Sequence, residues 1–140
     1  MTLPTAQITL DDVVVAIEVN RKILMLRKPK GKMWELPGRR VTEGNHTQRL
    51  IRCVYDYTGI DLTGQEFELV QERTVVLPTQ AAHGRPSAID YRLYRVILSR
   101  MPKIGNLHGY DKSGFYFPSE TVRFDVQLEH GMLIKMAYNL

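Results

Sequence analysis

Three side chains that could take part in chemistry lie close together between Arg52 and Ile60. Cys53, Asp56 and Tyr57 are spaced i, i+3 and i+4, which places them on one face if the segment is a helix. Carboxylates at that spacing would offer hard oxygen ligands to a divalent cation such as Mg²⁺. Only Asp56 carries one, because a thiol is a soft ligand and a phenol is neutral near pH 7. The pattern therefore predicts no metal site built from this face.

Basic side chains form a second group that could do chemistry. Eight of them fall between positions 21 and 40, namely Arg21, Lys22, Arg27, Lys28, Lys30, Lys32, Arg39 and Arg40, and only Glu35 opposes them within that window. Such a local surplus of positive charge can attract phosphates or nucleic acid. It can equally protect a strand edge against aggregation. The sequence leaves both interpretations open and does not show whether the eight side chains share a face.

Hydrophobic patterns predict the strands that would position these residues. Residues 13–19 and 22–26 are β-branched and aliphatic runs separated by Asn20-Arg21, which indicates a tight hairpin. Further strands are expected at 65–77, 89–98 and 114–117, the second with Tyr91, Leu93 and Ile97 on its buried face. A loop is expected from Pro37-Gly38 to Gly44-Asn45.

Two helices complete the predicted elements. The first runs to Thr58, with Asn45 as its N-cap and Gly59 as the left-handed residue that ends it. The second is C-terminal, and its expected core stripe consists of Leu128, Met132, Leu133, Met136 and Leu140. Strands that alternate with helices in this order imply a mixed sheet covered by helices.

Two segments resemble the halves of a Nudix box: Gly31 to Gly38, and Arg52 to Ile60. The family's box reads G-x5-E-x7-R-E-U-x-E-E-x-G-U, where U is a bulky aliphatic residue, and it holds divalent cations against a diphosphate. The likeness extends over residues 12–138, including the opening hairpin, the segment from Phe115 to Glu120 and the final helix. It implies the Nudix fold, an α/β architecture with a mixed β-sheet sandwiched between helices (α/β/α), as a single domain over residues 1–140.

The box itself departs from the family pattern. Arg39 stands where the family has its second glycine, Asn45 stands where it has its first glutamate, and one residue fewer separates Asn45 from Arg52. The three acids of the helical half have become Cys53, Asp56 and Tyr57. The retained Arg52 resembles the box arginine, whose role in the family is mainly to hold the loop by ion pairing. The resemblance therefore implies a degenerate box with no catalytic residues.

We predict a non-catalytic Nudix-like domain, a pseudoenzyme that binds RNA or a nucleotide phosphate through a basic cleft and needs no cofactor. The candidate phosphate-binding residues are Lys28, Lys30, Lys32, Arg39, Arg40 and Arg85. One alternative is a protein-interaction or structural module that uses the fold alone. The other is a hydrolase of nucleoside diphosphate derivatives, which would need Mg²⁺ and acids from elsewhere, such as Glu43, Glu66, Glu68, Glu72 and Glu120.

The composition of the chain excludes several classes of protein. The chain has 140 residues, 44% of them hydrophobic, which suits one globular domain and excludes general disorder. The longest aliphatic run, Val13 to Ile17, is far shorter than a membrane span, and no secretory signal is visible. The single cysteine, Cys53, excludes an internal disulfide, and zinc-ligand spacing is absent even with His46. We therefore expect a cytoplasmic protein with no membrane partner.

Overall fold

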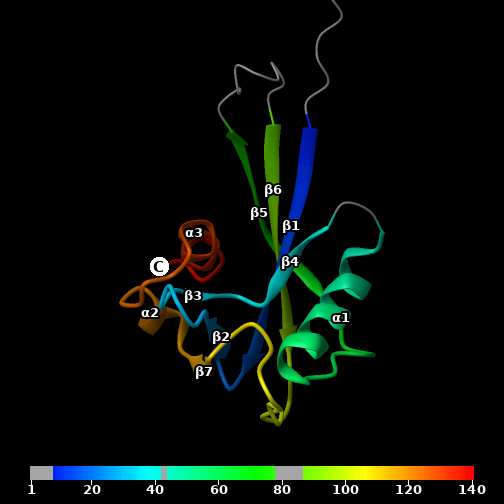
Figure 1. The fold of residues 1–140 in the computed structure, drawn as a ribbon, viewed down its shortest axis with the longest axis vertical. Coiled ribbons are helices and arrows are strands. Elements are labelled where there is room, and N and C mark those ends of the chain that lie inside the picture. Colours follow the sequence, from blue (N-terminus) through cyan, green and yellow to red (C-terminus); the bar gives the residue numbers. More distant parts are fainter. Residues whose placement is uncertain (1–7, 42–43, 78–86) are drawn as a thin grey trace, which may run out of the picture.

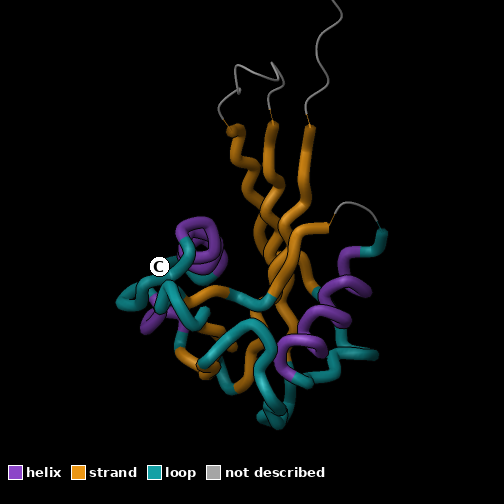
Figure 2. The backbone as a smooth tube through the Cα atoms, viewed as in Figure 1, coloured by secondary structure: helices purple, strands orange, loops and turns teal. Residues whose placement is uncertain are grey.

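A mixed seven-stranded sheet forms the centre of the protein in the computed structural model, which describes residues 8–41, 44–77 and 87–140 (Figures 1 and 2). Its strands are β1 (Ile8–Val19), β2 (Lys22–Arg27), β3 (Trp34–Glu35), β4 (Gly38–Val41), β5 (Glu68–Leu77), β6 (Ser87–Ile97) and β7 (Lys112–Tyr116). The main order is β3-β2-β1-β6-β5, while β4 also pairs with β1 and β7 with β2. The long β1–β6 pair is parallel and the other pairs are antiparallel.

The predicted hairpin is confirmed between β1 and β2. Asn20 and Arg21 both have positive φ, 51° and 67°, as a two-residue hairpin turn that follows the right-handed twist of its strands requires. This turn lies at the lower end of Figure 1. Arg21 lies in this turn, β2 begins with Lys22, and the other end of β2 leads to Lys28, Lys30 and Lys32.

Helix α1 (His46–Thr58) has both of the caps predicted for it. The Asn45 side-chain oxygen accepts hydrogen bonds from the backbone N–H groups of Thr47, at 2.9 Å, and Gln48, at 3.2 Å. Gly59 ends the helix with φ 78°, and its N–H donates to the Tyr55 carbonyl at 2.8 Å. Asn45 is therefore a structural cap at the position where the resemblance expects a metal-binding glutamate.

Helices cover both faces of the sheet, as predicted (Figure 1). On one face, Leu50, Cys53 and Val54 of α1 pack against Val13, Val15 and Ile17 of β1. On the other face, α3 (Leu128–Ala137) packs Leu133 and Ile134 against the alternate residues Val14 and Ala16, beside the short α2 (Pro118–Thr121). In the part of the chain that the structure describes, no helix is long and apolar enough to cross a membrane.

The prediction of which C-terminal helix side chains face the core is wrong. Leu128 is 71% exposed, Met136 41% and Leu140 50%, and only Leu133 of the predicted set is fully buried. The helix instead buries His130, Leu133 and Ile134. Hydrophobic periodicity could not identify the buried face because both faces of this helix carry apolar side chains.

Strand β6 and the segment after Pro37 also differ from the sequence predictions. Tyr91 and Leu93 are buried as expected, but Ile97 is 59% exposed and Val96 is buried in its place. The side chains still alternate, since Ile89, Tyr91 and Leu93 face the core under α3 and Tyr94 and Val96 face the core under α1. Both faces of β6 are therefore partly buried, and the sequence pattern identified only one of them. The expected loop after Pro37 contains β4, in which Gly38 lies so close to β1 that an added Cβ would be 2.2 Å from the Val13 carbonyl oxygen. Gly38 therefore permits the strand pairing that positions Arg39.

Candidate functional site

Cys53 lies on the side of α1 that faces the core, and its thiol is neutral near pH 7. Its side chain is 2% exposed, and burial raises the pKa of the thiol to about 12. The Sγ–H group donates to the Leu50 carbonyl at 3.5 Å. A protonated, buried thiol is neither a nucleophile nor a metal ligand near pH 7. Cys53 therefore acts as a core residue at a position where the family has a glutamate.

Asp56 is the carboxylate that remains on this face. It lies at the surface and pairs with Arg52, whose Nε is 3.6 Å from the Asp56 carboxylate. Both side chains are more than half exposed, so the pair contributes little to stability. Arg52 thus neutralises Asp56 along the helix and contacts no other described residue by an ion pair.

Arg39 lies on the same side of the sheet as Cys53 and Tyr57. In β4 it stands opposite Val13, whose side chain belongs to the core under α1, and side chains of directly opposed residues share a face. Burial raises the pKa of the Tyr57 phenol, and the positive charge of Arg39 partly counteracts that rise, as it does for Cys53. The positive charge of Arg39 therefore acts on both groups from the same side of the sheet. Arg39 stands where the resemblance places a glycine.

Arg40 points to the opposite side of the sheet. It stands opposite Asp12 in β4, and its charge counteracts the burial that raises the pKa values of Asp12 and Tyr91. Tyr91 belongs to the core under α3. The predicted neighbours Arg39 and Arg40 therefore face different surfaces, because successive side chains of a strand alternate.

Glu35 and Tyr110 complete this surface. The Tyr110 hydroxyl donates to Glu35 Oε1 at 2.6 Å, and burial together with this bond raises the pKa of Tyr110. The Tyr110 and Tyr57 rings meet edge to face, with centroids 5.4 Å apart. We call the group formed by Glu35, Arg39, Cys53, Tyr57 and Tyr110 the α1 site. The sequence places Glu35 in the segment that resembles the first half of a Nudix box and as a charge opposing the basic run, but it indicates no site role for Glu35, and no motif indicates Tyr110.

The other predicted basic residues do not join Arg39 in one cluster. Lys28 Nζ lies 3.8 Å from Glu35 Oε2, so it borders the α1 site through an ion pair. Lys30 and Lys32 are exposed in the turn between β2 and β3. Arg27 is engaged by Asp111, which accepts hydrogen bonds from Nε at 3.2 Å and Nη2 at 3.1 Å. Arg85 lies outside the described residues.

The described residues do not fit a Mg²⁺ site. Within residues 8–41, 44–77 and 87–140, no three His, Cys, Asp or Glu side chains are placed to hold a metal ion. The acids that could have rebuilt a site are occupied elsewhere: Glu68 pairs with Arg95, Glu72 pairs with Arg92, and Glu120 accepts from the Phe117 N–H. Glu66 lines a cavity with Gln65 and Arg95. Glu43 lies outside the described residues.

His46 is part of a polar contact on the sheet and not of a zinc site. Its Nε2 lies 3.1 Å from Asp11 Oδ2, and its Nδ1 lies 3.3 Å from the Tyr94 hydroxyl. Asp11 also accepts a bond from Arg92, at 2.9 Å. This arrangement joins the first turn of α1 to β1 and β6, away from the buried Cys53 thiol.

Several solved structures share this arrangement of strands and helices. The solution structure of the E. coli ORF135 protein matches with a TM-score of 0.73 and 19% identity, over 95% of this chain and 90% of that one. The NUDIX domain of Shewanella oneidensis NrtR, solved with ADP ribose, matches with a TM-score of 0.65 and 17% identity, over 96% and 88%.

A MutT NUDIX hydrolase from Burkholderia pseudomallei gives a TM-score of 0.66 and 17% identity, over 91% of this chain and 96% of that one. No family model and no curated protein sequence matches the chain. At these identities the likeness concerns the fold, and a fold does not determine what its site does. The chain therefore has the Nudix fold, as its sequence predicts.

Proposed function

We propose that the protein binds a nucleotide-type phosphate ligand at the α1 site and does not hydrolyse it. The observation that carries this proposal is the position of Arg39, which faces the same side of the sheet as Cys53 and Tyr57 and exerts its positive charge on both groups. In the family that this fold resembles, a divalent cation supplies positive charge to the diphosphate. Here Arg39 supplies that charge from the protein itself.

The charges around Arg39 suit an anionic ligand. Among the described residues, Arg39 makes no ion pair within 4 Å. The buried thiol of Cys53 and the phenol of Tyr57 are both neutral, so neither repels a phosphate. The carboxylate of the site, Glu35, lies 3.8 Å from Lys28 Nζ and accepts a hydrogen bond from the Tyr110 hydroxyl, so its charge is partly compensated. A guanidinium can donate two parallel hydrogen bonds to one phosphate group. These features support binding of a phosphate without a cation as bridge.

A nucleotide suits the site better than RNA does. The basic side chains are divided between the β1–β2 turn, the β2–β3 turn and the two faces of β4. An RNA backbone would need several of them along one continuous path. A nucleotide requires only one or two cations and a ring to stack on, and the half-buried Tyr57 beside Arg39 offers such a ring.

The family's route to hydrolysis is not supported by the residues of the α1 site. That route needs acidic ligands at the positions of Asn45, Cys53 and Tyr57, which are a helix cap, a protonated thiol and a phenol. Asp56 is paired with Arg52. Without several hard oxygen ligands, the attacking water is not activated by a metal ion.

Calorimetric titration with ADP and ADP-ribose tests the proposal, with one series in Mg²⁺ and one in EDTA. We expect affinity in EDTA at least as high as in Mg²⁺, because Mg²⁺ that binds the diphosphate competes with Arg39 for its charge. Arg39→Gln should weaken binding by about tenfold or more, the loss of one charge-assisted interaction. Arg40→Gln is the matched control, since it removes the same charge one residue away on the other face of β4.

Three outcomes would contradict the proposal. Absence of binding at millimolar nucleotide, or equal losses in the two variants, would remove the α1 site as the binding surface. Tighter binding of single-stranded RNA, with a steep dependence on salt, would favour a nucleic-acid partner. Turnover of ADP-ribose that needs Mg²⁺ or Mn²⁺ and disappears in Asp56→Ala would favour the hydrolase.

A further inference from the structure

We propose that the protein has a second ligand site, at the end of the molecule that carries the β1–β2 turn. Its ligand is a small molecule in which a carboxylate or phosphate is joined to a flat apolar body. This site is separate from the α1 site and does not depend on the proposed function. It uses Arg21, one of the basic residues that the α1 site leaves out.

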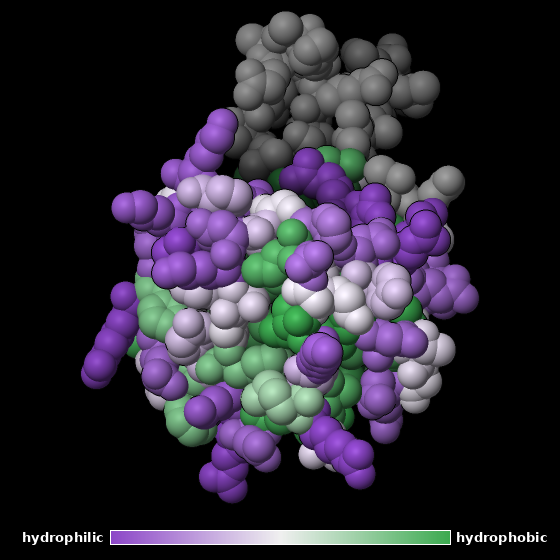
Figure 3. Space-filling model, turned by 60° about the horizontal axis from the view of Figure 1, so that its bottom comes forward, coloured by the Kyte–Doolittle hydropathy of each residue, from purple (hydrophilic) through white to green (hydrophobic). Residues whose placement is uncertain are grey.

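The site is a cavity of about 410 Å³ between the β1–β2 turn, the segment before α2 and the chain after α3. Its lining includes Glu18, Arg21, Arg95, Phe117, Tyr138 and Leu140. Its volume falls within the range of pockets that bind small molecules. Figure 3 turns this end of the molecule toward the reader and shows apolar surface in the centre, bordered by hydrophilic side chains.

Arg21 supplies a positive charge to this cavity. The residue sits in the turn with φ 67°, so the hairpin fixes where its side chain begins. In the part of the chain that the structure describes, Arg21 has no carboxylate within 4 Å. The next residue, Lys22, adds a second charge, with Nζ 5.0 Å from the centroid of the Phe117 ring.

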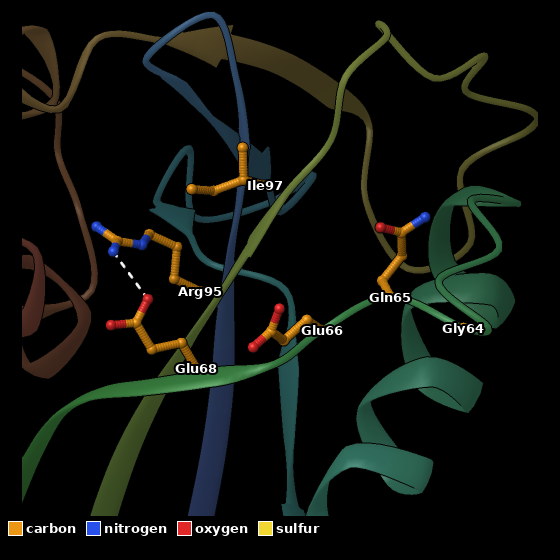
Figure 4. A pocket seen from close by; sticks show the side chains of 6 residues that line it. All are labelled: Gly64, Gln65, Glu66, Glu68, Arg95 and Ile97. Atoms are coloured by element: carbon orange, nitrogen blue, oxygen red, sulfur yellow. Dashed lines mark hydrogen bonds and ion pairs between the residues drawn. The ribbon is translucent and has the colours of Figure 1, made fainter.

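Arg95 supplies a donor without an acceptor. Its Nη2 donates to Glu68 at 2.8 Å, but its Nε is buried and has no hydrogen-bond partner among the described residues. Arg95 also borders an adjoining cavity of about 450 Å³, where Figure 4 shows its bond to Glu68 beside Glu66 and Ile97. The exposed part of the Arg95 side chain, 30% of its surface, lies on the lining of the first cavity and adds a second guanidinium beside Arg21.

The acids near the cavity are already engaged. Glu18 accepts a hydrogen bond from the Tyr138 hydroxyl at 3.1 Å, and Glu68 pairs with Arg95. Neither neutralises Arg21 directly. A ligand oxyanion is therefore the complement that Arg21 lacks among the described residues, since planar guanidinium groups match carboxylate and phosphate oxygens.

The remaining wall is apolar. Phe117 is 42% exposed, and Leu140, half exposed, lies on the same cavity. An aromatic face and an aliphatic side chain next to two guanidinium groups suit a ligand with an anionic end and a flat apolar body. Inorganic phosphate alone would use the arginines and leave Phe117 and Leu140 uncovered.

Amide NMR titration of the full chain tests this site, with phenyl phosphate, benzoate, inorganic phosphate and benzyl alcohol as probes. We expect saturable shifts at Arg21, Phe117 and Leu140 with phenyl phosphate or benzoate, and at least about tenfold weaker binding of benzyl alcohol, which lacks the charge. Whichever of phenyl phosphate and benzoate binds more tightly identifies the anionic group, phosphate or carboxylate, that the site prefers.

The variant Arg21→Gln should weaken the better probe by about tenfold, and Phe117→Ala should weaken it while inorganic phosphate is affected little. Arg100→Gln, at an exposed arginine that lines neither cavity, is the matched control and should have no effect. Retained amide spectra show that each variant is folded. Shifts that do not saturate, or equal effects of Arg21→Gln and Arg100→Gln, would overturn the proposal. So would shifts confined to α1 that disappear in Arg39→Gln.

Discussion

His130 connects α3 to the segment that carries Arg39. It is 6% exposed, and its Nδ1 accepts a hydrogen bond from the Leu36 backbone N–H at 3.1 Å. Leu36 lies between β3 and β4, two residues before Gly38. Accepting this bond at Nδ1 requires the neutral ring, because both ring nitrogens donate when histidine is protonated. Burial, together with a smaller contribution from the charge of Lys28, lowers the pKa of His130 to about 4.

This histidine predicts a pH-dependent free energy of unfolding. Between about pH 6.5 and pH 4, the unfolded chain binds a proton at His130 and the folded chain does not. Stability is therefore complete above pH 6.5 and falls with pH across this window, by about 3 kcal/mol in total. The variant His130→Asn should lose this dependence, because an amide oxygen can accept the same Leu36 N–H bond.

Urea denaturation at intervals of half a pH unit would measure this difference. Wild type and variant are compared at each pH, so that the contributions of the other titrating groups to the pH dependence largely cancel. Parallel curves for the two proteins would mean that His130 is protonated in the folded state or that its bond to Leu36 contributes nothing.

At the scale of elements, α3 shows how a helix can be predicted while its buried face is not. Its apolar residues lie on two faces, one formed by Leu133 and Ile134 against the sheet and one formed by Leu128 and Met136 toward solvent. Which face is buried depends on Trp34, Val70 and Val75, which pack into the same core from other segments. No window of the α3 sequence contains that information.

The two faces of α3 should differ sharply in their contribution to stability. Leu133→Ala removes buried methyl groups and leaves a cavity, so it should lower the free energy of unfolding by about 2–5 kcal/mol. Leu128→Gln replaces a 71% exposed side chain and should change it by less than about 0.5 kcal/mol. Urea unfolding of both variants would measure this contrast. A large loss in Leu128→Gln would show that the solvent-facing side of α3 is covered in solution.

Elements with their own local signals could be predicted from the sequence, and contacts between distant segments could not. Asn45 and Gly59 bound α1, and Asn20 marks the hairpin, because caps and tight turns depend on neighbouring residues. The shared face of Cys53 and Tyr57 follows from helical spacing. Tyr110 reaches Glu35 across 75 positions, a contact that depends on the whole fold.

The basic residues illustrate the same limit. A window of the sequence shows that cations are dense from Arg21 to Arg40 but not where the chain carries them. The length of β2 separates Arg21 from Lys28, and strand alternation separates Arg39 from Arg40. One predicted basic cleft thus becomes several surfaces, with Arg39 on the α1 site and Arg21 at the far end of the hairpin.

The whole molecule places its two candidate binding regions on different parts of one sheet. The α1 site lies where β4 meets α1, and the second cavity lies between the β1–β2 turn and the end of the chain. Each region draws its positive charge from arginine, which stays protonated at all working pH values. Binding at either region should therefore be insensitive to chelators.

This insensitivity should appear in the thermal stability of the whole protein. A ligand that binds only the folded state raises the melting temperature by mass action, so a specific Mg²⁺ site would stabilise the fold when millimolar Mg²⁺ replaces EDTA.

The described residues offer no cluster of three acidic or other metal-binding side chains, and Arg39 already lies on the same side of the sheet as α1. We therefore expect melting temperatures of the free protein within about one degree of each other in Mg²⁺ and in EDTA, and a rise on adding saturating ADP that is at least as large in EDTA as in Mg²⁺. Differential scanning calorimetry of the wild type and Arg39→Gln would measure this. If Mg²⁺ alone raised the melting temperature by several degrees, a metal site exists that the described residues do not form, and Glu43 would be the first acid to replace.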